Sequence, residues 1–146
     1  MGLDPISFDI ETSGLDDDAV VTVAGFAHPL GVELILNTGG RDADQNTLQT
    51  KLDDDAKGES SVEIVETESE LLEAVTDIAE KIDGDKHYLT AYNGETWQGG
   101  FDLPFCRTRF LAHDMAWPFG DVAYADMMEA VVDRFDTNDQ RDLVGV

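Results

Sequence analysis

Alternating and β-branched apolar residues near the N-terminus predict three strands. Residues 5–10 (PISFDI) alternate apolar and polar side chains, so we expect a first strand that ends near Glu11. Residues 19–27 (AVVTVAGFA) form a β-branched apolar run, a turn follows at 28–31, and residues 32–36 (VELIL) provide a partner strand. The domain is therefore predicted to begin with an antiparallel meander of three strands.

The middle of the chain changes from a polar segment to a helical pattern. Residues 38–61 are rich in Asp and Gly, which predicts a long solvated loop. A calcium loop is the weaker alternative, because the fixed ligand spacing with its late Glu is missing. A short extra strand is expected at 62–65. Residues 67–82 place apolar side chains on one helical face and begin with a capping box from Thr67 to Glu70.

Strands and helices continue to alternate in the second half of the chain. Residues 87–92 (HYLTAY) predict a further strand, and residues 103–113 have apolar side chains at helical spacing. Pro104 fits the first turn of that helix, where its missing N–H costs nothing. A short strand is expected at 122–124 and a short helix at 127–135. This order of elements is typical of an α/β layer domain.

Length and composition narrow the class of protein. The 146 residues with 42% hydrophobic content suit one domain over residues 1–146. Because 32 acidic residues oppose 9 basic ones, the formal net charge is -23, which excludes a basic nucleic-acid clamp. The composition resembles that of haloarchaeal cytoplasmic proteins, in which molar salt screens the repulsion between carboxylates. The alternative is an acidic protein that engages a basic partner.

No segment of the sequence predicts export or contact with a membrane. The chain has no run of 18 apolar residues and no basic and apolar N-terminal pattern, so we expect a cytoplasmic protein. The single cysteine, Cys106, fits a reducing compartment. The apolar residues at 142–146 suggest that the chain is cut from a longer one.

Three acids stand where a solvated surface explains them poorly. Asp9 and Glu11 end the first predicted strand, and their spacing of two puts both side chains on the same face. Asp102 begins a predicted helix, whose N–H groups would hold it ionised. The order of elements brings the end of the first strand toward this helix. Three carboxylates in one cleft would repel each other unless Mg²⁺ or Mn²⁺ neutralised them, so we expect a metal site.

The sequence around these acids resembles a known family. FDIETSGL at 8–15 is similar to the first motif of the DEDD 3′→5′ exonucleases, which belong to the ribonuclease-H-like superfamily. YNG at 92–94 followed by FDLPF at 101–105 resembles the second motif, particularly in family B polymerase exonucleases. The resemblance implies an α/β fold with a ribonuclease-H-like mixed sheet and helices on both faces. It also implies hydrolysis at single-stranded or frayed 3′ ends of nucleic acid.

The resemblance assigns a two-metal site to the acids. Asp9, Glu11 and Asp102 would be catalytic ligands of two Mg²⁺ or Mn²⁺ ions, which activate a water and stabilise charge on the scissile phosphate. The third motif, an Asp on a late helix that follows a Tyr or His, has no counterpart, and Asp126 is a weak substitute. Either the chain ends before that helix, or the protein is a catalytically inactive ribonuclease-H-like module that binds nucleic acid or acts as a scaffold.

The resemblance also implies contacts to the substrate. Glu11 and the backbone of Thr12 would meet the terminal 3′ hydroxyl, and Leu15 would pack against the last base. Asn93 and Phe101 match substrate-binding positions, although the insertion between them is longer than the family usually has.

Two further residue types in this region have both a binding and a structural interpretation. Arg107 and Arg109 could contact phosphate, but we favour helix packing and ion pairing. Trp97 could stack on a base or anchor its loop.

Overall fold

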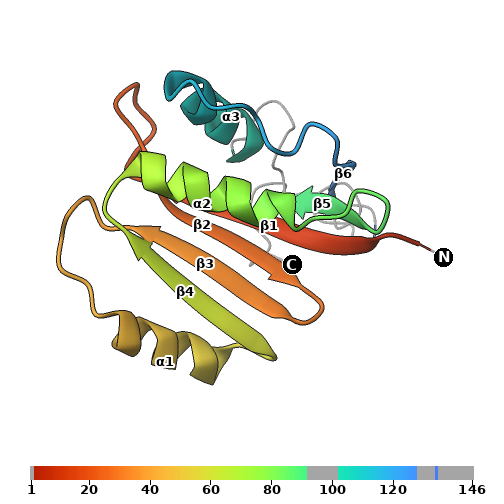
Figure 1. Cartoon of the computed structure of the whole chain (residues 1–146), viewed down its shortest axis with the longest axis horizontal. Helices are drawn as coiled ribbons and strands as arrows, with labels where there is room; N and C mark the ends of the chain where they lie inside the picture. Colours follow the sequence, from red (N-terminus) through yellow and green to blue (C-terminus); the bar gives the residue numbers. More distant parts are fainter. Residues whose placement is uncertain (1, 92–101, 128–133, 135–146) are drawn as a thin grey trace.

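The computed structural model describes residues 2–91, 102–127 and 134, and these form an α/β fold around one mixed sheet (Figure 1). The strands are β1 (Asp4–Thr12), β2 (Val21–His28), β3 (Gly31–Asn37), β4 (Glu59–Val65), β5 (His87–Ala91) and β6 (Tyr124–Asp126). The helices are α1 (Gln45–Asp55), α2 (Glu68–Glu80) and α3 (Asp102–Ala112). The strand order is β4-β3-β2-β1-β5-β6.

The predicted antiparallel meander is confirmed. β1 pairs antiparallel with β2, and β2 pairs antiparallel with β3. The remaining pairs, β3 with β4, β1 with β5 and β5 with β6, are parallel, so β2 alone runs against the other described strands. Because β1 and β5 are parallel neighbours, their C-terminal ends lie at the same edge of the sheet. Asp9 and Glu11 lie near the C-terminal end of β1, at this end of the sheet.

One face of the sheet is covered by α2 and α3, and the core lies between them (Figure 1). Ile6, Phe8 and Ile10 alternate along β1 and are buried on this face. The tilted rings of Phe8 and Phe26 have centroids 5.0 Å apart, and Phe119 completes the aromatic group at 5.9 Å from Phe8. The directional ring contacts add to the burial of apolar area. The face that packs was therefore encoded by the period-two pattern of β1.

Helix α2 follows its sequence prediction closely. The side chain of Thr67 accepts from the N–H of Glu70, and the Glu70 carboxylate accepts from the N–H of Thr67, which completes the capping box. Leu71, Leu72 and Val75 have no exposed surface and face the core. The helix is thus held by its cap and by apolar burial.

Helix α1 corrects the prediction of a continuous loop at 38–61. The helix occupies Gln45–Asp55, and β4 starts earlier than predicted, at Glu59. Its N-cap, Asp44, accepts hydrogen bonds from two N–H groups of the first turn. Helix α1 buries none of its residues fully, and its apolar side is limited to the half-buried Leu48 and Leu52, which is too short a pattern to predict a helix.

Side-chain amides attach α1 to the outer edge of β4. The Gln49 amide donates to the carbonyl of Ser60 at 2.9 Å and accepts from the N–H of Val62 at 2.9 Å. Gln45 donates to the carbonyl of Val62. A group that joins the C=O of residue 60 to the N–H of residue 62 repeats the pairing of a parallel neighbouring strand. The two glutamines therefore occupy three backbone groups on the open side of β4, namely the carbonyls of Ser60 and Val62 and the N–H of Val62.

Several predictions about the C-terminal part fall outside the described residues. Most of the helix expected at 127–135 does so, as does the apolar end at 142–146. The described helices α2 and α3 cover the same face, so the expected helices on both faces are not seen in this part of the chain.

None of the described helices combines the length and apolarity needed to cross a membrane.

Candidate metal site

Asp9 and Glu11 project from the face of β1 opposite the core. Their neighbours Phe8 and Ile10 are buried, whereas both acids are exposed, as the spacing of two predicts. Across the ladder, Asp9 lies opposite Gly25, and the Leu34 side chain packs over this glycine. Both acids line a groove of about 230 Å³ whose other walls are largely apolar.

Asp102 reaches this pair from the first turn of α3. Its half-buried carboxyl is hydrogen-bonded to the Asp9 side chain and accepts from the N–H of Ile10. Burial, the hydrogen bond with Asp9 and the charge of Asp9 raise the pKa of Asp102 to about 7, and the charge of Glu11 adds to this effect. The N–H of Ile10 acts in the opposite direction but does not compensate.

The pKa of Asp102 corrects one expectation from the sequence. We expected the helix N-terminus to keep this carboxyl ionised, but a neighbouring carboxylate and burial outweigh the N–H groups. The side chain that the sequence placed near the end of β1 does meet Asp9. What the sequence did not predict is that the two acids share a hydrogen bond, which requires a proton on one of them.

The described residues provide a pair of acids rather than a complete ligand set. In residues 2–91 and 102–127, no three His, Cys, Asp or Glu side chains are arranged to hold a metal ion. Asp9 and Asp102 are in contact, and Glu11 acts on Asp102 through its charge. Two oxygen-ligand groups that repel when both are ionised match the chemistry of Mg²⁺ or Mn²⁺. Asp126, the weak substitute, accepts a hydrogen bond from the Tyr124 hydroxyl at 3.0 Å.

The remaining predicted site residues have different outcomes. The Thr12 hydroxyl donates to the carbonyl of Gly14 at 2.7 Å, so it stabilises the local turn. Leu15 is 85% exposed in the segment after β1 and is accessible to a ligand. Asn93, Phe101 and Trp97 lie outside the described residues.

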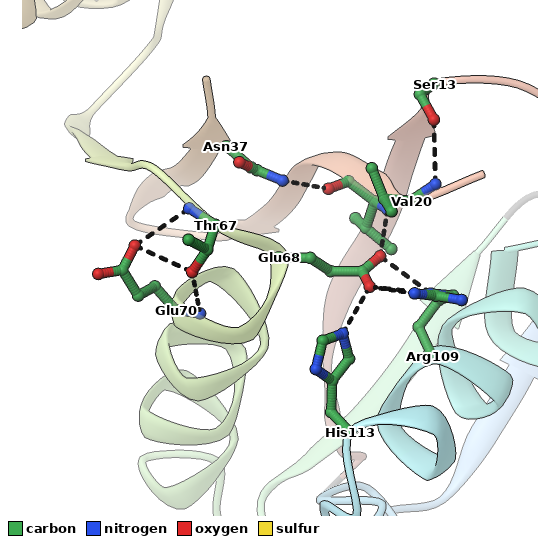
Figure 2. Close-up of polar contacts among 9 residues, drawn as sticks. Ser13, Val20, Asn37, Thr67, Glu68, Glu70, Arg109 and His113 are labelled. Carbon is green, nitrogen blue, oxygen red and sulfur yellow. Dashed lines mark hydrogen bonds and ion pairs between the residues drawn. The ribbon is translucent and has the colours of Figure 1, made fainter. Parts of the chain in front are cut away.

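A second acid, Glu68, lies at the centre of a buried polar cluster (Figure 2). Glu68 is the first residue of α2 and only 6% exposed. Arg109 donates to it through Nε at 2.9 Å and Nη2 at 2.6 Å, and His113 Nε2 lies 2.7 Å away. The N–H of Val21 also donates, at 2.6 Å. We call Glu68, Arg109 and His113 the Glu68 cluster.

The electrostatics of Glu68 are opposite to those of Asp102. Burial by itself raises the pKa of Glu68, but the hydrogen bonds from Arg109, the Val21 N–H and His113 hold it below its ordinary value. Glu68 therefore stays ionised and paired. The ion pair confirms our interpretation that Arg109 serves packing and ion pairing. Arg107 lies over the Trp117 ring, with its Cζ 5.6 Å from the ring centroid.

Sequence reasoning missed Glu68, although a signal was present. Glu68 precedes Leu71 by three and Leu72 by four positions, so it belongs to the apolar face of α2. An acid on a buried face needs a basic partner. Arg109 and His113, four residues apart on one predicted helix, were candidates for that role.

Comparison with known proteins gives no family assignment. No protein-family profile matches the chain, and no curated protein is significantly similar to it in sequence. The site geometry and the motifs are therefore what support a function.

Proposed function

We propose that the protein is a metal-dependent 3′→5′ exonuclease of the DEDD type that hydrolyses phosphodiester bonds at single-stranded or frayed nucleic-acid ends. The observation that carries this proposal is the contact between Asp9 and Asp102. Burial and the Asp9 carboxylate are the main causes of the raised pKa of Asp102. Such a pair needs either a proton or a cation beside it, and a divalent ion can supply that charge.

The sheet and the groove are consistent with this proposal. An antiparallel meander followed by strands parallel to β1 agrees with the ribonuclease-H-like sheet that the motifs imply. The groove beside Asp9 and Glu11 is lined by Val23, Gly25 and Leu34, which offer an apolar surface to a sugar or base. High salt weakens phosphate contacts, so stacking and metal bridging would carry more of the binding energy.

The residues have distinct roles in this proposal. Asp9 and Asp102 would hold the metal, with Glu11 beside them as the third acid. When bound, the ions lower the pKa of an attacking water and stabilise charge on the scissile phosphate. Because the pKa of Asp102 without metal is raised to about 7, loading the site below that pH would release a proton, and metal affinity would rise with pH up to about 7. Leu15 is exposed where it could pack against the terminal base.

Labelled oligonucleotides test the proposed activity directly. The 146-residue chain is incubated in molar KCl with single-stranded DNA or RNA labelled at the 5′ end, with Mn²⁺, Mg²⁺ or EDTA. We expect stepwise shortening from the 3′ end with Mn²⁺, none with EDTA, and none for Asp9→Ala or Asp102→Ala. Asp17→Ala removes the same charge from an exposed loop and is the matched control.

A non-catalytic nucleic-acid-binding module is the second candidate. It is favoured by the lack of three metal ligands in the described residues and by the missing third motif. Full-length oligonucleotide that is bound but never shortened, with or without Mn²⁺, would support this module and contradict the exonuclease.

A further inference from the structure

The inner face of α3 connects the candidate metal site to the Glu68 cluster. Asp102, Cys106 and Arg109 are spaced by four and three residues, so they lie on the same side of the helix, and His113 follows directly after its last residue, Ala112. Asp102 and Arg109 are about 10 Å apart along the helix axis at 1.5 Å per residue. Cys106 lies between them on the same helix and is fully buried. The candidate metal site and the Glu68 cluster are therefore linked by one continuous helix.

Glu68 joins α3 to the strands that carry Asp9. Its carboxylate accepts from Arg109 on α3 and from His113 just after α3 (Figure 2). It also accepts from the N–H of Val21 at the start of β2. Val21 lies opposite Thr12 at the end of β1. On its other side, the carbonyl of Val21 accepts from the Asn37 amide at 3.1 Å. The cluster thus ties the helix that begins with Asp102 to the end of the β1–β2 ladder.

Apolar packing and the ion pair constrain α3 differently. Leu103, Cys106 and Phe110 bury the helix against the sheet, but apolar attraction is non-directional. The Arg109 guanidinium presents two N–H groups to the Glu68 carboxylate, and a fork of this kind fixes both distance and orientation. The fork therefore restricts sliding and rotation of the helix more specifically than the apolar packing does.

We propose that Glu68 is a positioning residue for the metal site: through Arg109 it fixes the rotation and height of α3 and thereby sets the Asp102 carboxylate against Asp9. This inference rests on the proposed function, because it concerns the same site. Glu68 and Arg109 would then affect metal affinity although they contact neither metal nor substrate, which the proposed function alone does not require. A purely structural cluster would affect stability without a specific effect on metal binding.

Mn²⁺ affinity separates the two roles. Binding is measured from the free Mn²⁺ signal in electron paramagnetic resonance, in molar KCl so that weak association with surface acids is suppressed. Broadening of the Ile10 amide resonance in NMR spectra reports occupancy of the candidate site itself. Asp102→Asn defines the part of the binding that belongs to this site.

Arg109→Lys is the decisive variant. Lysine keeps the charge but lacks the planar fork, so the helix loses its orientation while the buried carboxylate keeps a cation. We expect Mn²⁺ affinity to fall about three- to tenfold, which matches a loss of about 0.6–1.4 kcal/mol. Ile35→Val, a core substitution in β3 away from α3, is the control for general loss of stability, and we expect it to leave Mn²⁺ affinity unchanged.

Each outcome bears on a different claim. If Arg109→Lys binds Mn²⁺ as tightly as the wild type, or if Ile35→Val weakens binding equally at a similar loss of Tm, the positioning role is wrong while the metal site stands. If the wild type fails to bind, or if Asp102→Asn binds as tightly, the proposed metal site itself fails and the positioning role fails with it. Glu68→Gln leaves Arg109 without its charged partner and serves only as a secondary variant.

Discussion

Glu68 and Asp102 are each the first residue of a helix, and each is at least partly buried. Glu68 contacts basic side chains, whereas Asp102 contacts another acid. Glu68 receives Arg109 and His113, and its pKa is lowered. Asp102 receives the acid Asp9, and its pKa is raised to about 7. The chain has only 9 Lys and Arg residues and commits one of them to Glu68. The difference indicates that the charge of the structural acid Glu68 is balanced by basic side chains of the protein. The charge of Asp102 has to be balanced by a proton or a cation from solvent.

The largest expected effect comes from removing Glu68, the acid that is paired with basic side chains. Glu68→Ala leaves Arg109, whose side chain is 19% exposed, without its charged partner and the buried Val21 N–H without its acceptor. We expect a loss of about 3–5 kcal/mol in the free energy of unfolding. Urea unfolding in molar KCl measures it, with the exposed Glu66→Ala as control. A loss no larger than that of the control would show that the cluster does not hold α2 and α3 together.

Binding of metal at the Asp9–Asp102 site should stabilise the folded protein. Free Mn²⁺ at about a hundred times its Kd should raise the free energy of unfolding by about 2.7 kcal/mol, because it binds the native state only. Thermal unfolding with Mn²⁺ and then with excess EDTA measures the gain and its reversal. Equal stabilisation of Asp102→Asn would mean that the ion binds scattered surface acids instead.

Removing the acid should stabilise the metal-free protein above neutral pH. The folded pKa of Asp102 is about 7, above its ordinary value of 3.8, so its contribution to stability falls as pH rises between these values. At about pH 8, Asp102→Asn should therefore gain about 1–2 kcal/mol after allowance for solvent screening. Below about pH 4 the gain should vanish, since the carboxyl is then protonated in both states. A gain that is independent of pH would contradict the raised pKa.

Salt should act on the two acids unequally, and this is the smallest effect. Between tenth-molar and molar KCl the Debye length falls from about 10 Å to about 3 Å, which screens the half-buried Asp9–Asp102 pair more than the buried Glu68. The gain from Asp102→Asn should shrink by about 0.5 kcal/mol, while the cost of Glu68→Ala stays constant. The net charge of -23 predicts that the wild type itself is more stable in molar KCl. Higher stability in dilute buffer would contradict salt adaptation.

Much of the fold was predictable because apolar patterns are local. The alternation in β1 and the helical period of α2 each identify one buried face, and the structure contains both elements. Helix α1 was not predictable in this way. It is attached by Gln45 and Gln49 rather than by an apolar face, so its sequence reads as polar loop.

The candidate site was predictable in part for a different reason. The strand order alone brings Asp102 toward Asp9, because β1 and β5 end at the same edge. The raised pKa of Asp102 depends on burial and on the hydrogen bond with Asp9, and these arise only from tertiary packing. Glu68 was missed because an acid in the first turn of a helix is usually explained by the helix dipole. Its burial depends on where α3 lies.

The hydrogen bonds of Gln45 and Gln49 to β4 affect whether copies of this protein associate in solution. A flat outer strand with free N–H and C=O groups invites pairing with another chain, and many folds protect it with charge or proline. Here two neutral glutamines do so, and neutral hydrogen bonds keep their strength when salt screens charges. At high ionic strength, where the repulsion between copies of this acidic protein is screened, this uncharged cover would still hinder pairing of another chain with β4.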